Sequence, residues 1–444
     1  MLTDWELYSV IGRREVLKLS AQQLGDSARS IEGMMISMSR RIFEGLKVLD
    51  FTNNVAGPGA SALLADYGAE VIKIERPVSG DDTRGWASNV LENYSWYPWL
   101  NRGKKSVTIS LTDPDGLAIV KKMVTDADVV LQAFRPGVMR RFGLDYESVA
   151  TVNPNVVYCS ISAYGQTGPK ALKPGYDQIA QAYTGLTDMT GEPDGPPTRV
   201  RISILDHSTG INAFGSICAA LYHRERTREG QHIDVSLVGT AFSMNDVFEE
   251  VAEATALGIS INATRVGRFS SYPGTGTYRG KGNQYCEIAV NNEKLWGLLC
   301  QAMDREDLIT DPRSESLLSR LKNAPFLNTI IEDWVASFED INVALEKLDK
   351  FGVPNSKVKA VADLVTDEHL LARGAITDIP APTSMQARGV ATIRARGPWH
   401  VLSKTPLQMR KAPDLGEHNV EVLMQYGLNA EEIGRLQEKW NTSK

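Results

Sequence analysis

The 444-residue sequence has few of the residues that hold metals or build disulfide frameworks. It contains four cysteines and six histidines, and neither set shows the close spacing of a zinc site or a C-x-x-C motif. Cysteines scattered in this way are typical of a reducing compartment, so we expect a cytoplasmic protein without a metal. No apolar run reaches the length of about 18 residues that a membrane span requires.

The sequence also lacks an excess of positive charge. Lys and Arg total 48 against 54 Asp and Glu, which gives a net charge of −6. A net negative charge gives no overall electrostatic attraction to nucleic acid or to an anionic membrane. With 42% hydrophobic and 23% charged residues, the composition is that of a globular protein. The length predicts two or three domains.

From Phe43 onward, short apolar segments alternate with helical patterns. This order favours an α/β fold with a doubly wound, Rossmann-like parallel sheet. The expected strands cover residues 46–51, 70–74, 106–111, 128–131 and 156–161.

Changes in composition divide the chain. Charges and apolar residues at helical spacing predict a helical N-terminal extension over residues 1–41. Residues 42–240 and 352–444 are expected to form one discontinuous large domain. Residues 241–351, which include a stretch rich in Gly and Ser, predict a linker and a smaller α+β domain.

The glycine turn after the first strand admits a dinucleotide interpretation. Gly57 and Gly59 precede a helix, and Glu75 follows the next strand, but the third glycine of a G-x-G-x-x-G fingerprint is missing. An NAD-dependent oxidoreductase is therefore an alternative with a weak signal.

Two basic groups lie at the ends of predicted strands, one after the strand over 128–131 and one before the strand over 106–111. Arg135, Arg140 and Arg141 form the first, and the second comprises Arg102, Lys104 and Lys105. Arginine makes bidentate contacts to phosphate, so a phosphorylated ligand is one interpretation and a solvated helix face is the other.

Asp206 follows the largely apolar segment 202–205, which we expect to be a strand, and precedes a helix expected over 211–221. A carboxylate at the end of a strand and beside a helix N-terminus lies where open α/β sheets bind ligands. It is either an N-cap or a nucleophile that forms a covalent acyl intermediate. Backbone N–H groups near Asp206, and those of a glycine loop over 274–276, are expected to stabilise an oxyanion.

Several longer strings occur in the order found in one known family. They are L-L-A-D-Y-G-A-E-V-I-K-I-E-R-P (63–77), G-D-D-T-R-G-W (80–86), F-R-P-G-V-M-R-R-F-G-L (134–144), P-D-G-P-P-T (193–198) and G-Q-H-I-D-V-S-L (230–237). From about Phe43 to its end, the chain resembles the family III coenzyme A transferases.

The resemblance implies an enzyme that moves CoA from an acyl-CoA thioester to a free acid. The family's nucleophile falls on Asp206, which would form an aspartyl anhydride and then an aspartyl-CoA thioester. The only cofactor implied is CoA itself, as substrate. The implied CoA- and substrate-binding residues are Val55, Ala56, Arg76, Phe134, Arg141, Lys173 and Asp177, with Gly274 and Gly276 in a glycine loop that covers the site.

The same fold hosts α-methylacyl-CoA racemases, so an acyl-CoA epimerase is an alternative. Racemases exchange a proton through a His–Asp pair and a glutamate, whereas here the corresponding positions hold Tyr176 and Arg279. Tyrosine is a poor base at neutral pH, so transferase is favoured. Family members form interlocked dimers, which implies a homodimer, and a heteromer with this chain as a silent CoA-binding subunit stays open.

Overall fold

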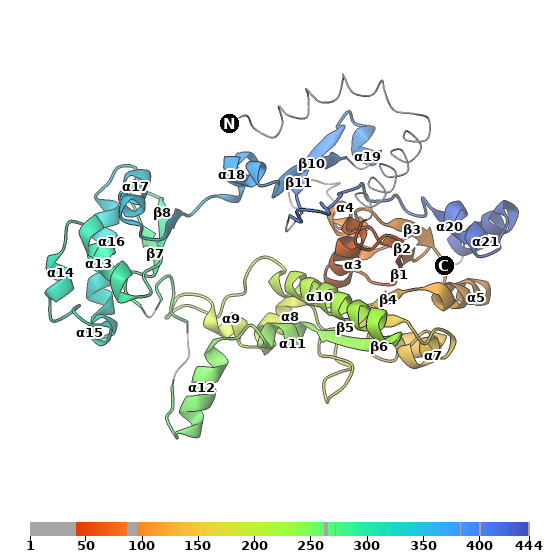
Figure 1. Ribbon diagram of the computed structural model, residues 1–444, viewed down its shortest axis with the longest axis horizontal. Coiled ribbons are helices and arrows are strands. Elements are labelled where there is room, and N and C mark those ends of the chain that lie inside the picture. The colour runs from red at the N-terminus through yellow and green to blue at the C-terminus, as the bar shows by residue number, and fades with distance from the viewer. Residues whose placement is uncertain are drawn as a thin grey trace, which may run out of the picture.

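The computed structural model describes residues 41–86, 96–261, 265–270, 272–381, 383–398 and 401–442 (Figure 1). The helical extension expected before Arg41 lies outside these residues. In the described part of the chain, no helix is long and apolar enough to cross a membrane.

A six-stranded parallel sheet forms the centre of the large domain, and its strand order is β3-β2-β1-β4-β5-β6. This is the Rossmann order, so the predicted fold class is confirmed. The strands are β1 (Lys47–Asp50), β2 (Glu70–Glu75), β3 (Lys105–Thr108), β4 (Val129–Gln132), β5 (Val157–Ser162) and β6 (Gln231–Ser236).

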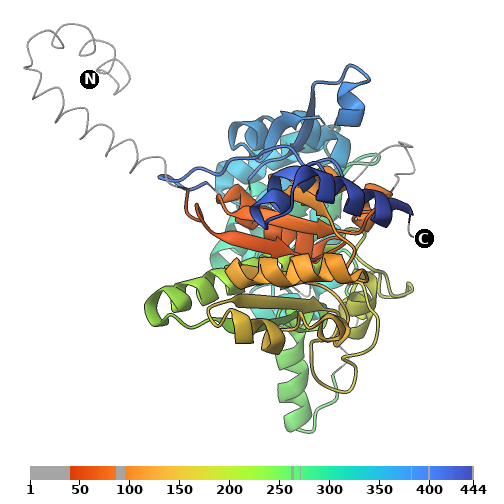
Figure 2. The ribbon, with the colours of Figure 1, turned by 90° about the vertical axis from the view of Figure 1, so that its right-hand side faces the viewer.

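Helices cover both faces of the sheet because alternate strand residues point to opposite sides. Val48 belongs to the core on one face and Leu49 to the core on the other. The first face is covered by α3 (Ala56–Asp66), α8 (Asp177–Tyr183), α10 (Ile204–Thr227) and α11 (Leu237–Phe242). The second is covered by α5 (Pro114–Met123), α7 (Tyr146–Val152), α20 (Asn419–Gln425) and α21 (Ala430–Thr442), as Figure 2 shows for α5, α20 and α21.

A smaller α+β unit has its own core. Its antiparallel sheet consists of β7 (Gly276–Arg279), β8 (Tyr285–Ile288) and β9 (Asn355–Lys357). The helices α13 (Glu293–Ala302), α16 (Ala324–Ala336) and α17 (Ile341–Phe351) pack on it. The chain then returns to the large domain through the hairpin of β10 (Ile376–Pro380) and β11 (Thr392–Arg396).

Two expected features differ from the structure. Residues 202–205 do not form a strand, because α10 begins at Ile204 and runs through the helix that we expected over 211–221. The edge strand β6 was not expected, since Gln231, His232 and Asp234 alternate with its apolar residues.

Buried ion pairs fix the carboxyl end of β1. One oxygen of the fully buried Asp50 accepts hydrogen bonds from the N–H and hydroxyl of Thr52, at 2.8 and 2.5 Å. The other accepts from Ser61, at 2.7 Å, and from the Lys104 ammonium, at 2.9 Å. Lys73 donates to the Thr52 carbonyl at 2.7 Å. Burial favours a raised pKa for Asp50, but Lys104 and Lys73 outweigh it and hold the pKa well below its usual range.

We expect Asp50→Ala to lower the free energy of unfolding by about 3–5 kcal/mol, because the ammonium groups of Lys104 and Lys73 stay buried without this partner. Urea denaturation measures the loss. The matched control is Glu339→Ala, which removes an exposed pair with Lys281 and should cost less than about 1 kcal/mol. Losses of similar size in the two variants would contradict this account.

Candidate active site

The strand order reverses direction between β1 and β4, and this point locates the site. In open α/β sheets, ligands bind in the crevice beyond the carboxyl ends of the strands where the order reverses. The loops that follow β1 and β4 there carry Phe51–Ala56 and Phe134–Gly137.

A pocket of about 360 Å³ opens at this crevice. It contains three of the predicted CoA-binding residues, Arg76, Phe134 and Arg141. Its other lining residues include Phe51, Thr52, Asn53, Ile109, Leu111 and Val138. Apolar walls with two guanidinium groups suit a flat aromatic group that carries phosphates.

The two arginines of this pocket differ in their contacts. Arg76 donates to the carbonyl of Gly80, at 3.2 and 3.3 Å, and pairs with Asp82. The exposed Arg141 guanidinium makes no hydrogen bond or ion pair with any residue that the structure describes. Arg141 therefore has its donors available for an anion.

A continuous segment leads from the pocket to α10. Phe51, Thr52 and Asn53 line the pocket, and the chain goes directly on to the buried Val55 and Ala56. Ala56 lies against α10, because a Cβ added at Gly210 would stand 2.7 Å from the Ala56 carbonyl oxygen. Gly210 lies about one helical turn after Asp206. The segment that leads out of the pocket thus packs on α10 one helical turn after the predicted nucleophile.

Asp206 lies in the first turn of α10 and is partly buried. It is not the N-cap, since Ser203 has that position and another carboxylate, Asp177, binds the end of the helix. Of the two interpretations of Asp206, the N-cap is therefore wrong. Its carboxylate does not bind the backbone N–H groups at the start of α10.

The second predicted acidic residue, Asp177, performs the capping. Its Oδ2 accepts hydrogen bonds from the N–H groups of Leu205, at 2.7 Å, and Asp206, at 3.2 Å. Its Oδ1 accepts from the side chain of Gln181, which in turn accepts from the Val200 N–H at 2.9 Å. Asp177 is only 2% exposed. The structure therefore makes it a positioning residue for the start of α10.

This arrangement occupies the backbone N–H groups near Asp206. Leu205 and Asp206 donate to Asp177, while Ile204 donates to the Ile202 carbonyl and His207 to the Ser203 carbonyl. The expectation that these amides would stabilise an oxyanion is wrong, because none of the four is free. Donors for an oxyanion must come from other groups.

The surroundings of Asp206 favour its neutral form. Burial, followed by repulsion from Asp177, raises its pKa to about 7. Burial and the nearby Arg396 lower the pKa of His207 to about 4, although Asp177 acts in the opposite direction. Near neutral pH, Asp206 is close to its midpoint of ionisation and His207 is uncharged.

Glu75, which the dinucleotide interpretation required, is only 3% exposed. It accepts from Arg84 through both oxygens, at 2.8 Å each, and from the Ser106 hydroxyl at 2.6 Å. Burial favours a raised pKa, but Arg84 and Lys73 lower it to about 2. A carboxylate engaged in this way is not available to bind a ribose.

The basic group that begins at Arg102 also has an internal role. Arg102 pairs with Asp66 at 2.5 Å, and Lys104 pairs with Asp50 at 2.9 Å. Both side chains are almost fully buried, so neither presents its charge to a phosphate in the crevice. The sequence showed these cations but not their partners, which lie far away along the chain.

The remaining predicted residues belong to segments other than α10 and the lining of the pocket. Lys173 is exposed on the loop before α8. Gly274 and Gly276 are buried in the smaller unit, where the Gly274 N–H donates to the Tyr278 hydroxyl at 3.0 Å. A Cβ at Gly274 would lie 3.0 Å from the side chain of Val290. Figure 1 shows this unit standing apart from α10.

Sequence reasoning missed the residues that support the site, among them Gln181, Lys73 and Asp50. Gln181 lies four residues after Asp177 on one helix, and this spacing was a usable signal. For Lys73 and Asp50 the only signal was a charge inside an apolar strand, which indicates a buried partner.

Comparison with known proteins agrees with this geometry. The profile of CoA-transferase family III matches residues 43–419. Succinate–glutarate CoA-transferase of Agrobacterium fabrum is 33% identical over 394 residues, with 85% of this chain and 94% of the relative covered. Acetyl-CoA:oxalate CoA-transferase of Acetobacter aceti is 39% identical over 324 residues, with 72% and 82% covered.

Solved structures show the same fold. A CAIB/BAIF family protein from Brucella suis matches with a TM-score of 0.72 and 32% identity over 86% of this chain and 98% of the other. Rv3272 from Mycobacterium tuberculosis matches with a TM-score of 0.74 and 29% identity over 86% and 99%. From the profile match and these relatives, we conclude that the chain is an enzyme of CoA-transferase family III.

Proposed function

We propose that this enzyme transfers CoA between carboxylic acids through covalent intermediates on Asp206. The observation that carries the proposal is the position of Asp206. It lies on the first turn of α10, one helical turn before the point where Ala56, at the end of the segment that leads from the arginine-containing pocket, packs on this helix. The CoA nucleotide would occupy the pocket, and the pantetheine arm would follow residues 53–56 toward α10.

The first half of the reaction loads CoA onto the enzyme. An Asp206 oxygen attacks the thioester carbonyl, the C–S bond breaks, and the CoA thiolate leaves an acyl-aspartyl anhydride. The thiolate then attacks the aspartyl carbonyl of this anhydride. The donor acid leaves as a carboxylate, and Asp206 carries CoA as a thioester.

The second half reverses these steps with the acceptor. The acceptor carboxylate attacks the aspartyl thioester and forms a new anhydride as CoA thiolate leaves. The thiolate attacks the acceptor acyl carbon, which releases the new acyl-CoA and restores the Asp206 carboxylate. No electrons are exchanged with a redox partner, so CoA is the only carrier that the proposal needs.

The environment of Asp206 serves this chemistry. Only the ionised carboxylate is nucleophilic, and partial burial removes part of the hydration shell that would otherwise have to reorganise in the attack. The same burial, together with Asp177, raises the pKa of Asp206 to about 7. The site therefore needs a pH near or above 7 to hold its nucleophile in the reactive form.

The names of relatives support dicarboxylic acids as the substrate class. The Agrobacterium relative is named for succinate and glutarate, and that of Acetobacter aceti for oxalate. The chain covers 94% and 82% of these two proteins. Succinyl-CoA with a panel of short dicarboxylates is therefore the first assay that we would use.

The structure gives the alternative activities little support. Tyr176 and Arg279 hold the positions of the racemase proton carriers. Tyr176 is 63% exposed before α8, whereas Arg279 lies on β7 of the smaller unit and donates to the Gly282 carbonyl. The interpretation as an NAD-dependent oxidoreductase requires Glu75 to bind a ribose. Both oxygens of Glu75 instead accept hydrogen bonds from Arg84.

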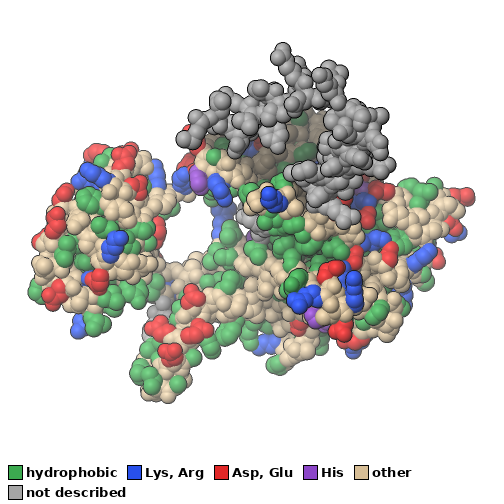
Figure 3. Space-filling view, viewed as in Figure 1, with side chains coloured by type: hydrophobic (Ala, Val, Ile, Leu, Met, Phe, Trp, Pro, Cys, Tyr) green, Lys and Arg blue, Asp and Glu red, His purple; other side chains and the backbone are tan. Residues whose placement is uncertain are grey.

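We also propose that two chains interlock as a homodimer. Figure 3 shows an opening between the smaller unit and the large domain, wide enough to be visible in the space-filling view. Large apolar side chains are exposed from the loop before α8 to the segment after α12 (Val247–Ala256), including Leu172, Ile179, Ile202, Phe242, Phe248 and Leu257. An apolar surface of this kind favours burial against a partner chain.

Asp206→Ala should reduce transfer from succinyl-CoA to a dicarboxylate by about 10³-fold or more, because no other group accepts the acyl chain. Coupled assay of acyl-CoA formation measures this, with binding of free CoA as the test that the pocket is intact. The control is Asp363→Asn, which changes an exposed aspartate in the 3-10 helix Val361–Thr366, outside both α10 and the lining of the pocket. Transfer at the unmodified rate by Asp206→Ala would refute the proposed nucleophile.

The pH dependence of kcat/KM should follow the ionisation of Asp206. Because the raised pKa is about 7, the rate should fall about tenfold per pH unit below that value and level off above it. Asp177→Asn keeps an acceptor for the α10 amides and removes the repelling charge, so it should move this limb to lower pH. Asp177→Ala also loses the cap and should cost about 1 kcal/mol of stability in urea. An acidic limb at the same pH in wild type and Asp177→Asn would contradict this explanation.

The interlocked dimer predicts a particle of twice the 48.8 kDa chain mass in light scattering. It also predicts that tagged and untagged proteins exchange subunits only after denaturation and refolding. Two interlocked chains cannot separate while both are folded. A monomer at micromolar concentration, or exchange of subunits without denaturant, would contradict the arrangement.

A further inference from the structure

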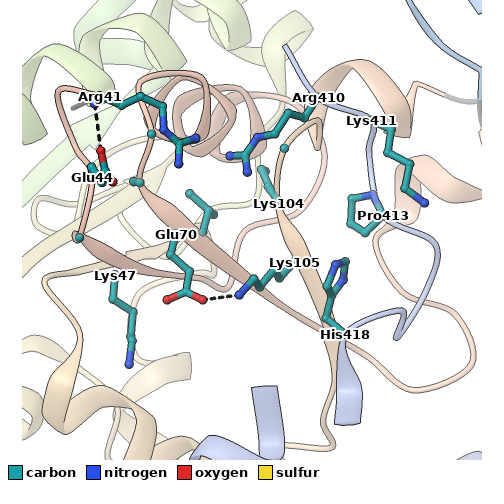
Figure 4. Close-up of a pocket in the computed structure, with 15 residues that line it drawn as sticks. Arg41, Glu44, Lys47, Glu70, Lys104, Lys105, Arg410, Lys411, Pro413 and His418 are labelled. Carbon is teal, nitrogen blue, oxygen red and sulfur yellow. Dashed lines mark hydrogen bonds and ion pairs between the residues drawn. The ribbon is translucent and has the colours of Figure 1, made fainter. Parts of the chain in front are cut away.

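A second polar pocket lies at the opposite end of the parallel sheet from Asp206. It has a volume of about 470 Å³ and is shown in Figure 4. Lys47 and Glu70 on its wall are the first residues of β1 and β2, and Lys105 begins β3. Residues that follow the other ends of the same strands line the first pocket. The two pockets are therefore separate sites on opposite edges of one sheet.

Positive side chains dominate this second pocket, but three of them are neutralised by carboxylates. Lys47 pairs with Asp126 at 2.5 Å, and Lys105 with Glu70 at 2.5 Å. Lys411 pairs with Glu417 at 2.8 Å. A fourth, Lys104, directs its ammonium into the interior toward Asp50. Two other positively charged residues line the pocket and take part in none of these ion pairs.

Those two residues are Arg41 and Arg410, which approach from different parts of the chain. In Figure 4 their guanidinium groups point toward each other across the pocket. Among the described residues, neither has a carboxylate within ion-pair distance; Arg410 donates only to the Ala65 carbonyl, at 3.3 Å. Loss of water contact and repulsion from Arg41 lower the pKa of Arg410, although the Asp66 carboxylate acts in the opposite direction.

Two like charges on facing side chains repel each other, and an anion bound between them removes that repulsion. Arginine presents a planar fork that matches the oxygens of a phosphate, and two forks from opposite walls can share the oxygens of one phosphoryl group. Glycines let both arginine side chains lie close to the backbone, since a Cβ added at Gly68 would stand 2.4 Å from the Arg41 Cβ, and one at Gly103 would stand 3.5 Å from the Arg410 Nε. The volume exceeds that of a bare phosphate and leaves space for a small organic group.

We infer that this pocket binds a phosphoryl group between Arg41 and Arg410, either as free phosphate or as the end of a small phosphomonoester. The site is independent of the proposed transferase chemistry, because it lies at the other edge of the sheet. A ligand there would join the segment before β1 to the Arg410 segment that follows the β10–β11 hairpin.

Isothermal titration of the full-length protein with inorganic phosphate, and separately with glycerol 3-phosphate, tests the site. Arg410→Gln and Arg41→Gln should each weaken binding about tenfold or more, whereas Arg410→Lys, which keeps the charge, should weaken it less. The control Arg435→Gln removes an exposed arginine on α21 and should bind as wild type does. Thermal melting of each variant checks that it is folded.

Two further arms identify the location and the ligand class. Arg141→Gln removes the anion donor of the first pocket, so phosphate binding that persists in this variant belongs to the second pocket. Tighter binding of the monoester than of phosphate would identify a phosphomonoester, and the reverse would identify free phosphate. The inference fails if wild type binds neither probe, if Arg410→Gln binds phosphate normally, if Arg141→Gln abolishes binding, or if succinate binds as tightly as phosphate.

Discussion

The site depends on one buried carboxylate at the start of one helix. Asp177 receives the N–H groups of Leu205 and Asp206, and this contact begins α10 two residues before Asp206. A helix end left without partners in a partly buried location would be costly. Asp177, which lies on α8, accepts these hydrogen bonds. The Asp206 carboxylate is therefore not needed to cap α10. The cap also places a negative charge beside Asp206 and so helps to set its pKa.

The parallel sheet connects this local constraint to substrate binding. Its order reverses between β1 and β4, which opens the crevice where Arg76, Phe134 and Arg141 meet. Close packing of α3 against α10 at Gly210 then joins the crevice to Asp206. The loop that follows β1 is fixed at Thr52, whose N–H donates to Asp50, and Asp50 in turn is paired with Lys104. In the proposed reaction, binding energy from the remote nucleotide would position the thioester at Asp206.

Much of this architecture could be predicted from the sequence, for identifiable reasons. Apolar strands such as 129–132 and 157–162 are buried on both faces, so their patterns are unambiguous. The start of α10 could not be predicted, because Ile202, Ile204 and Leu205 form an apolar pattern that is typical of a strand. The residue that caps the helix, Asp177, lies 29 positions before Asp206. The pairing of Lys104 with Asp50 was likewise invisible, since it depends on tertiary contacts. The residues at the crevice were placed by resemblance, and their convergence in one pocket is a result of the structure.

The central claim is that Asp206 itself becomes covalently linked to CoA. Peptide mass mapping after rapid acid quenching of the enzyme with succinyl-CoA tests it most directly. The account predicts a peptide that contains Asp206 and is heavier by CoA less one water, and that is absent when Asp206 is replaced by alanine. Turnover without any modified peptide, or the same mass on a different carboxylate, would contradict it.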